Sequence, residues 1–216
     1  MSMSNRSAVV LVTGMEDVEI PTQFSEPGST ESSLIEYVLN SVWTVVDQIF
    51  VVFNHEPDLR IVEAIAPFGV KIIVEETHGG GGSNSNILSA MKIGMEASRS
   101  ELCFVMMGNT PFIKPNVIFA LFEGARGFDA AIPKRPDGSV NPLLAVYRTK
   151  AFLRALETNK DAATPQDVVD WLNAIRFIDV EKEIKSLDPD LNSLFQINTE
   201  EDIQKARNIA STLMRR

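Results

Sequence analysis

Short apolar runs alternate with helix-like patterns over the first 133 residues of the chain. The apolar runs, rich in β-branched side chains, predict buried strands at residues 8–12, 49–53, 70–74, 102–107 and 129–133. Between them, apolar residues recur at helical spacing in segments that begin near Leu34, Pro57, Ile87 and Pro115. The alternation predicts an α/β fold of three layers, in which a mostly parallel sheet carries helices on both faces.

The pattern is less regular after residue 133. Residues 143–147 predict another strand, and residues 193–197 predict a short one. Thr164 followed by Pro165 predicts the start of a helix, because proline fits the first helical position. Thr199 and Asp202 predict the cap of a last helix. We expect residues 1–216 to form one domain, with residues 134–198 as its irregular half.

The composition narrows the class of protein. Of 216 residues, 20 are Lys or Arg and 29 are Asp or Glu, which gives a net charge of −9. This balance argues against a nucleic-acid partner, since binding to phosphates needs clustered cations. Cys103 is the single cysteine, so no disulfide can form within the chain and a cytoplasmic setting is expected. We expect no membrane span, because no apolar run reaches about 18 residues.

Candidate chemistry follows the predicted strands, since ligands of open parallel sheets bind beyond the carboxyl ends of the strands. The segments expected there are residues 13–33, 79–86, 108–111 and 198–199. The first holds Gly14 but no glycine-rich phosphate motif. Between Arg6 and Arg60 the chain has nine carboxylates and no Lys or Arg, so a triphosphate would meet like charges there. A solvated surface loop is therefore an alternative interpretation of residues 13–33.

The other segments offer polar groups that also have two interpretations. Glycines 79–82 would let the backbone approach a ligand closely, or would form a flexible connection. Asn109 offers a neutral oxygen that binds Mg²⁺ more weakly than an aspartate would, and its structural alternative is an Asx turn. The alternative for Asn198 is a helix cap. With two histidines and one cysteine, the chain is not expected to hold zinc.

Ordered sequence segments carry a family resemblance. They are Leu11-Val12-Thr13-Gly14, residues 33–39, residues 108–113, residues 137–147 and residues 195–202. In this order they resemble the molybdenum-cofactor guanylyltransferases, a group within the MobA-like nucleotidyltransferases. The last two segments are the most specific, because the family reads D-G-x-x-x-P-L-x-A-V-Y and N-I-N-T-P-E-D there. The resemblance covers residue 8 to about residue 207.

The resemblance implies a Rossmann-like nucleotidyltransferase fold, with residues 8–133 as the nucleotide-binding half and residues 134–207 as the acceptor-side half. The family transfers GMP from GTP to the phosphate of molybdopterin with Mg²⁺ and releases pyrophosphate. By position, it implies nucleotide binding by Leu11, Gly14, Gly81, Gly82 and Asn84. It places Asn109 at the metal position, and Asn141, Pro142 and Asn198 on the acceptor side.

The chain departs from the family pattern at charged positions. The Arg and Lys of the family's signature loop are absent, Asn109 replaces an aspartate, and Gln196 replaces the first asparagine of N-I-N-T. Nucleotidyl transfer depends on positioning and charge neutralisation, and the loss of one electrostatic group can cost about 10²–10³ in rate. One hypothesis is a divergent but active guanylyltransferase, its missing charge supplied by Lys92, Lys114, Lys134 or Arg135. The alternative is a catalytically weak or inactive binding module.

Overall fold

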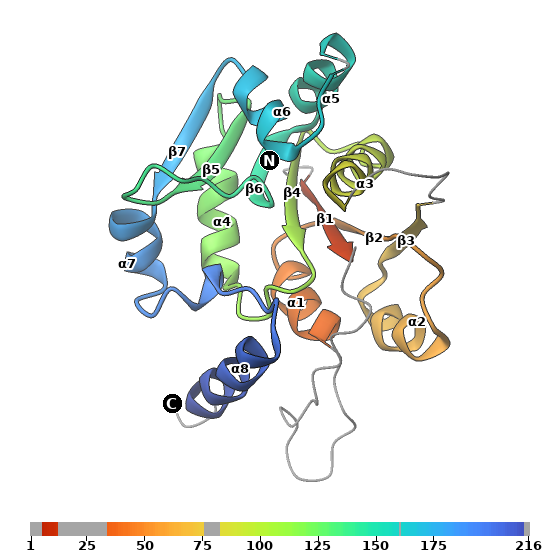
Figure 1. The fold of residues 1–216 in the computed structure, drawn as a ribbon, viewed down its shortest axis with the longest axis vertical. Coiled ribbons are helices and arrows are strands. Elements are labelled where there is room, and N and C mark those ends of the chain that lie inside the picture. The colour runs from red at the N-terminus through yellow and green to blue at the C-terminus, as the bar shows by residue number, and fades with distance from the viewer. Residues whose placement is uncertain (1–5, 13–33, 76–82, 160, 214–216) are drawn as a thin grey trace.

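A seven-stranded sheet forms the centre of the molecule, in the strand order β3-β2-β1-β4-β6-β5-β7 (Figure 1). The computed structural model describes residues 6–12, 34–75, 83–159 and 161–213. The strands are β1 (Arg6–Val12), β2 (Gln48–Phe53), β3 (Lys71–Val74), β4 (Leu102–Met107), β5 (Ala130–Lys134), β6 (Leu144–Arg148) and β7 (Ile175–Asp179). Neighbouring strands are parallel, except that β6 runs antiparallel to β4 and β5. The predicted mostly parallel sheet is confirmed.

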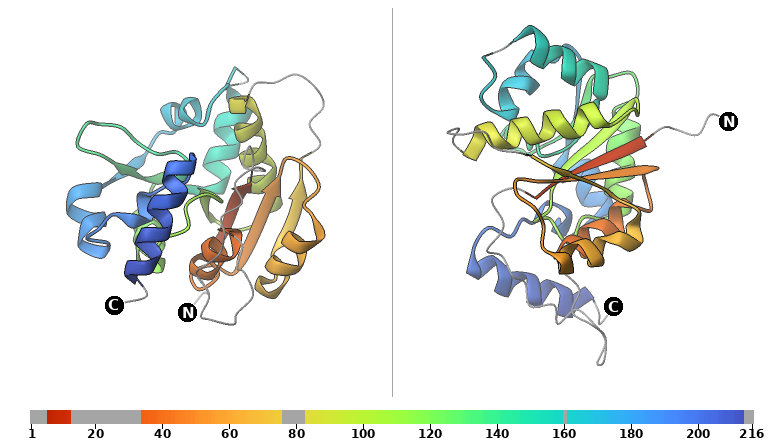
Figure 2. Two further views of the ribbon diagram at one scale, coloured as in Figure 1. Left: turned by 60° about the horizontal axis from the view of Figure 1, so that its bottom comes forward. Right: turned by 90° about the vertical axis from the view of Figure 1, so that its right-hand side faces the viewer.

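Helices cover both faces of this sheet, which confirms the predicted three layers (Figure 2). One layer contains α1 (Leu34–Val42), α2 (Leu59–Ile65) and α4 (Pro115–Gly124). The other contains α3 (Ser83–Ala97), α5 (Thr149–Thr158) and α6 (Pro165–Trp171). The last helix, α8 (Glu200–Leu213), lies apart from these layers at the bottom of Figure 1. The short elements are η1 (Ala66–Phe68), η2 (Val180–Ile184), α7 (Lys185–Leu187) and η3 (Asn192–Leu194).

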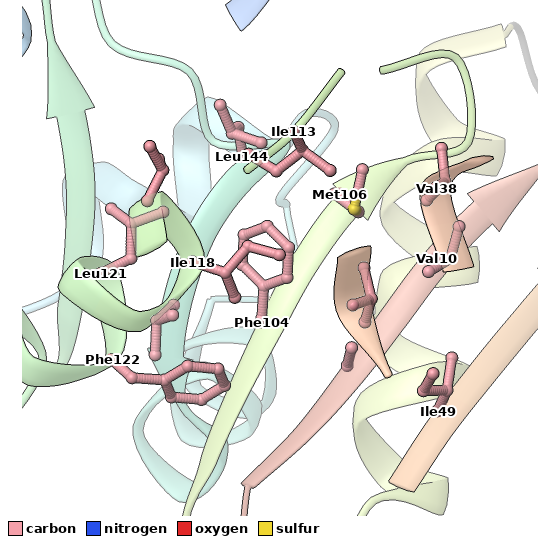
Figure 3. Close-up of a cluster of buried hydrophobic side chains, with 14 of the residues drawn as sticks. Val10, Val38, Ile49, Phe104, Met106, Ile113, Ile118, Leu121, Phe122 and Leu144 are labelled. Atoms are coloured by element: carbon pink, nitrogen blue, oxygen red, sulfur yellow. The ribbon is translucent and has the colours of Figure 1, made fainter. Parts of the chain in front are cut away.

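Alternate residues of the central strands serve the two faces of the sheet. Val10 of β1 and Phe104 of β4 belong to the buried cluster that includes Leu121 of α4 (Figure 3). Val9, the neighbour of Val10, belongs to the cluster on the opposite face, together with residues of α3, α5 and α6. Strand side chains point alternately to the two faces, so an unbroken apolar run is what a sheet covered on both sides requires.

The structure differs from expectation in several elements. The predicted strand at residues 193–197 is wrong: residues Asn192–Leu194 form the 3₁₀ helix η3, and no strand follows them before α8. There the backbone N–H of Ser193 donates to the Asp188 carboxylate and the N–H of Phe195 donates to the Asn192 carbonyl, so these groups are satisfied locally. The structure adds α5 and β7, which the sequence reading did not predict. It also starts α3 at Ser83, within residues expected to form a loop.

Two helix starts that the sequence predicts are confirmed. Thr164 and Asp167 form a capping box at the start of α6, each side chain accepting a backbone N–H of the other. Thr199 and Asp202 make the same reciprocal contacts at the start of α8. These bonds satisfy donors that a helix start otherwise leaves unpaired.

Cys103 is fully buried in β4, and burial raises the pKa of its thiol to about 12. Within the described residues, no helix has both the length and the apolar character needed to cross a bilayer.

Candidate functional site

The carboxyl ends of β1 and β4 lie side by side and define the edge where we expect a ligand. The strands pair in parallel register, and the N–H of Gly108, just after β4, donates to the carbonyl of Leu11 at 2.9 Å. A Cβ on Gly108 would lie 3.2 Å from a methyl group of Val12, so glycine permits this close approach. The Leu11 side chain is fully buried in the core. Only its backbone can therefore serve the nucleotide role that the resemblance implies.

Asn109 joins this edge to the segment before α8. Its side-chain nitrogen Nδ2 donates to the carbonyl of Ile197 at 3.1 Å and to Oδ1 of Asn198 at 2.9 Å. In return, the N–H of Ile197 donates to the Asn109 carbonyl at 3.0 Å. Two segments 89 residues apart in sequence are thus held together by three hydrogen bonds. The structure therefore brings together two of the residues that the sequence singled out, Asn109 and Asn198.

A small apolar cluster supports the same junction. Phe112, which follows Asn109, packs with Ile197 and with Ile203 and Ala206 of α8. Burial of such side chains contributes roughly 1.5–3 kcal/mol each. This apolar packing therefore holds the start of α8 next to Asn109 and stabilises the hydrogen bonds of its side-chain amide.

The helix cap that was the alternative interpretation of Asn198 is made by Thr199 instead, whose hydroxyl accepts the N–H of Asp202. The backbone N–H of Asn198 donates to the Asp202 carboxylate at 3.1 Å, and the N–H and hydroxyl of Thr199 donate to the same oxygen. These hydrogen bonds hold the pKa of Asp202 below its usual value, and the bond from the Thr199 hydroxyl contributes most. Asn198 thus lies just before the cap, and its side chain meets Asn109.

The orientation of the Asn109 amide follows from its neighbours. The Ile197 carbonyl can only accept a hydrogen bond, so the nitrogen of Asn109 must face it. Oδ1 of Asn109 and the hydroxyl of Thr110 are both buried and have no hydrogen-bond partner among the described residues. A buried acceptor of this kind costs about 1–3 kcal/mol when unpaired. Both groups are therefore candidates to contact a ligand.

The oxygens around Asn109 do not match what a divalent cation requires. Mg²⁺ prefers anionic oxygens, whereas Asn109 presents one neutral amide oxygen. The nearby carbonyl of Ile197 and Oδ1 of Asn198 both face an N–H donor. In the part of the chain that the structure describes, no three His, Cys, Asp or Glu side chains gather in a way that could hold a metal ion.

The lysines proposed to replace the missing loop charge have other contacts. Nζ of Lys134 lies 4.9 Å from the centre of the Phe177 ring, so it leans toward β7, on the side of β5 away from β4. Nζ of Lys114 lies 2.7 Å from the buried carboxylate of Asp188. Nζ of Lys92 lies 3.8 Å from Glu96 on the same helix. None of these three contacts directs a lysine toward the ends of β1 and β4.

Arg135 lies with Lys134 along an open groove on the β5–β7 side of the sheet. The groove also contains Arg176 and Phe177 of β7, with Asp179 and Glu183 supplying opposite charge. Its mixed charge makes it a weaker attractor for a polyanion than a uniformly basic surface.

The acceptor-side residues reach the same edge by way of β6. Leu144 of β6 pairs with Met106 of β4, so the residues just before β6 lie beside the residues just after β4. Oδ1 of Asn141 accepts the N–H of Leu143 at 3.0 Å, and the carbonyl of Pro142 accepts the hydroxyl of Tyr147 at 2.7 Å. Burial raises the pKa of Tyr147 well above its usual range, so this hydroxyl stays a donor. Oδ1 of Asn141 and the carbonyl of Pro142 are thus both paired with nearby groups of the same segment.

Several predicted nucleotide residues cannot be placed. Gly14, Gly81 and Gly82 lie outside the described residues. Asn84 lies in the first turn of α3, and its side chain is also outside the description.

One candidate was missed by the sequence reading. Glu75 follows β3 directly, is buried, and has an oxygen Oε2 without a hydrogen-bond partner among the described residues. Its backbone N–H donates to the carbonyl of Phe53 at 2.7 Å, which fixes it at the strand edge. A carboxylate directly after the apolar run of residues 72–74 was the available signal.

Comparison with known proteins identifies the family. Residues 29–175 match the MobA-like NTP transferase domain. The chain is 29% identical over 217 residues to a probable molybdenum cofactor guanylyltransferase of Methanosarcina acetivorans, covering 93% of this chain and 89% of that protein. It is 26% identical to a counterpart of the same description from Natronomonas pharaonis, covering 81% and 83% of the two chains.

Solved structures support the same conclusion. The crystal structure of molybdopterin-guanine dinucleotide biosynthesis protein A from Archaeoglobus fulgidus matches with a TM-score of 0.69 and 26% identity, covering 95% of this chain and 99% of that one. The fold is also that of 2-C-methyl-D-erythritol 4-phosphate cytidylyltransferase from Thermus thermophilus, with a TM-score of 0.62 and 17% identity over 95% and 98% of the chains. The fold is therefore the Rossmann-like fold of nucleotidyltransferases, and the chain belongs to the MobA-like NTP transferase domain family.

Proposed function

We propose that this protein is a divergent guanylyltransferase of the molybdenum-cofactor type, which binds GTP and transfers GMP to the phosphate of a molybdopterin-type acceptor. In that reaction an acceptor phosphate oxygen forms a bond to the α-phosphorus of GTP. The bond between the α-phosphorus and the bridging oxygen breaks, and pyrophosphate leaves. The names of the curated relatives and of the Archaeoglobus structure support this choice of substrates.

The contact of Asn109 with Asn198 is the single observation that supports the proposal most. It joins the loop after β4 to the segment before α8, beside the end of β1. A transferase must hold two substrates at a fixed separation, because correct orientation supplies a large part of the rate acceleration. A rigid junction between these segments meets that requirement.

The roles proposed for individual residues divide along the chain. Residues 8–133 would bind the nucleotide, with the backbone at Leu11 and Gly14 near the phosphates and Gly81, Gly82 and Asn84 near the base. Residues 134–207 would bind the acceptor, through Asn141, Pro142 and Asn198. Asn109 and Thr110 would contact the ligand with their buried, unpartnered oxygens.

A second candidate function is a binding module with little or no turnover. The positions of Lys114 and Lys134 favour it, since Lys114 pairs with Asp188 and Lys134 stacks on Phe177. A polyanionic transition state without nearby cations loses its main source of stabilisation. The two candidates share nucleotide binding and differ in whether pyrophosphate is released.

Calorimetry and a product assay separate these functions. Titration with GTP and with ATP, each with Mg²⁺ and in EDTA, should show GTP binding with a Kd of roughly 1–100 µM, about −5.5 to −8 kcal/mol. Addition of molybdopterin should then release pyrophosphate. Binding without pyrophosphate would favour the module, and no heat with any nucleotide would exclude both.

A variant of Asn198 tests the assigned site. Asn198 is exposed, so the alanine variant should fold, and pyrophosphate release should fall at least about tenfold, equal to ~1.4 kcal/mol. Asn208→Ala, an exposed asparagine on α8, is the matched control and should keep wild-type turnover.

A further inference from the structure

One nitrogen faces two oxygens at the junction between β4 and α8. Nδ2 of Asn109 lies 3.1 Å from the Ile197 carbonyl and 2.9 Å from Oδ1 of Asn198. Asn109 is 4% exposed and Ile197 is 1% exposed, so water can do little to replace this donor. Within this junction, one nitrogen that carries partial positive charge therefore donates to both oxygens.

A carboxylate in the place of the Asn109 amide would reverse this arrangement. The carboxylate oxygen in the place of Nδ2 would face the Ile197 carbonyl and Oδ1 of Asn198 at hydrogen-bond distance, without a hydrogen between them. The exposed Asn198 could turn its amide to donate. The Ile197 carbonyl has no hydrogen to donate, and the Ile197 N–H already donates to the Asn109 carbonyl. A carboxylate would therefore need a proton or a cation to sit beside the Ile197 carbonyl.

We propose that the Asn109 amide takes the place of a divalent cation as the positive group that joins the end of β4 to the segment before α8. These two segments are then held together without metal, and Asn109→Asp would convert the junction into one that needs a cation. The inference goes beyond the proposed transferase function and does not depend on it, since it concerns the protein before any nucleotide binds.

Binding of Mn²⁺ tests the proposal directly. Titration with Mn²⁺, followed by electron paramagnetic resonance, measures the Kd of each Mn²⁺ site. Any site on the wild-type protein that Asn109→Ala removes should have a Kd above about 1 mM. The Asn109→Asp variant should gain one site at least about tenfold tighter, or ~1.4 kcal/mol. A wild-type site in the micromolar range that Asn109→Ala abolishes would overturn the proposal. A Mn²⁺ site whose Kd is the same in Asn109→Ala lies elsewhere on this acidic chain, and such a site is consistent with the proposal.

Thermal unfolding gives an independent readout without nucleotide. The wild-type Tm should move by less than about 1 °C between EDTA and 5 mM Mg²⁺. Asn109→Asp should melt about 4–8 °C lower in EDTA and regain at least half of that loss with Mg²⁺. Asn109→Ala should also melt lower, but without recovery in Mg²⁺. Equal melting of wild type and Asn109→Asp in EDTA, with no response to Mg²⁺, would contradict the proposal.

If Asn109→Asp does not fold in EDTA, addition of Mg²⁺ gives a further test. Refolding on addition of Mg²⁺ would support the proposal, and failure to refold leaves the wild-type Mn²⁺ titration to decide it. Loss of GTP binding or of pyrophosphate release would count against the transferase function alone.

Discussion

The side-chain nitrogen of Asn109 lies 2.9 Å from Oδ1 of Asn198, across 89 positions of sequence. This contact, together with the bond to the Ile197 carbonyl, ties the last helix to the central strand of the sheet. The candidate site is built around it.

Asn109→Ala should destabilise the protein by about 1–3 kcal/mol, because the buried Ile197 carbonyl loses its side-chain donor. Urea unfolding followed by circular dichroism measures the change. Asn208→Ala, on the exposed surface of α8, should change stability by less than about 0.5 kcal/mol. Equal stabilities of the two variants would show that the Asn109 contacts contribute nothing to the junction.

The ion pair of Lys114 with Asp188 should be a stronger anchor. Asp188 is fully buried, and its other oxygen accepts the N–H of Ser193 at 2.6 Å. Lys114→Ala should therefore cost about 3–5 kcal/mol, at the high end for a single substitution, because it leaves the buried carboxylate of Asp188 without its partner. Lys205→Ala, which removes a pair on the exposed side of α8, should leave the free energy of unfolding almost unchanged. Similar losses in the two variants would refute a special role for the buried pair.

The cap of α8 should make stability depend on pH in the acid range. The folded pKa of Asp202 lies below its ordinary value of 3.8, so the unfolded state binds its proton first as pH falls. Its contribution is present above pH 3.8 and is lost as pH falls through the lower, folded pKa. Tm measured from pH 2 to 7 should fall in this window.

Thr199→Ala provides the matched test of that pH dependence. The Thr199 hydroxyl is the main group that lowers the pKa of Asp202, so its removal should raise that pKa toward 3.8. NMR titration of the Asp202 carboxyl reports the change directly. Asn208→Ala should leave the titration curve where it is, and an unshifted curve in Thr199→Ala would contradict the assignment.

Cys103 should be unreactive in the folded protein. Complete burial raises the pKa of its thiol to about 12, so almost no thiolate exists at pH 8, and the sulfur is also out of reach. An aromatic disulfide reagent at pH 8 should modify less than about a tenth of the native protein in an hour, and all of it in denaturant. Rapid stoichiometric reaction of the native protein would show that β4 opens readily.

The regular half of the fold was predictable because its signals are local. The unbroken apolar runs of β1, β2 and β4 reflect burial on both faces of a parallel sheet, which the order of residues alone reveals. The caps at Thr164 and Thr199 act within four residues and were also visible. Of the missed elements, α5 carries apolar residues at helical spacing and could have been found.

The other failures have a physical cause in the tertiary structure. The edge strand β7 exposes Arg176 and Phe177, so it lacks the apolar run that marks a buried strand. Residues 193–197 resemble a strand in composition, but the buried carboxylate of Asp188 captures the Ser193 N–H and turns the chain. The position of β7 at the edge of the sheet follows from the order of the strands, which a short window of sequence does not show.

The sequence by itself determined the layered α/β fold, the family and the identities of Asn109 and Asn198, since these depend on side-chain periodicity and on ordered motifs. Only the tertiary structure decided that the two asparagines meet, and that Lys114 and Lys134 are held by Asp188 and Phe177. Contacts between segments far apart in the chain depend on how the sheet orders its strands and on where each helix begins. Their partners are therefore set by packing and not by neighbouring residues.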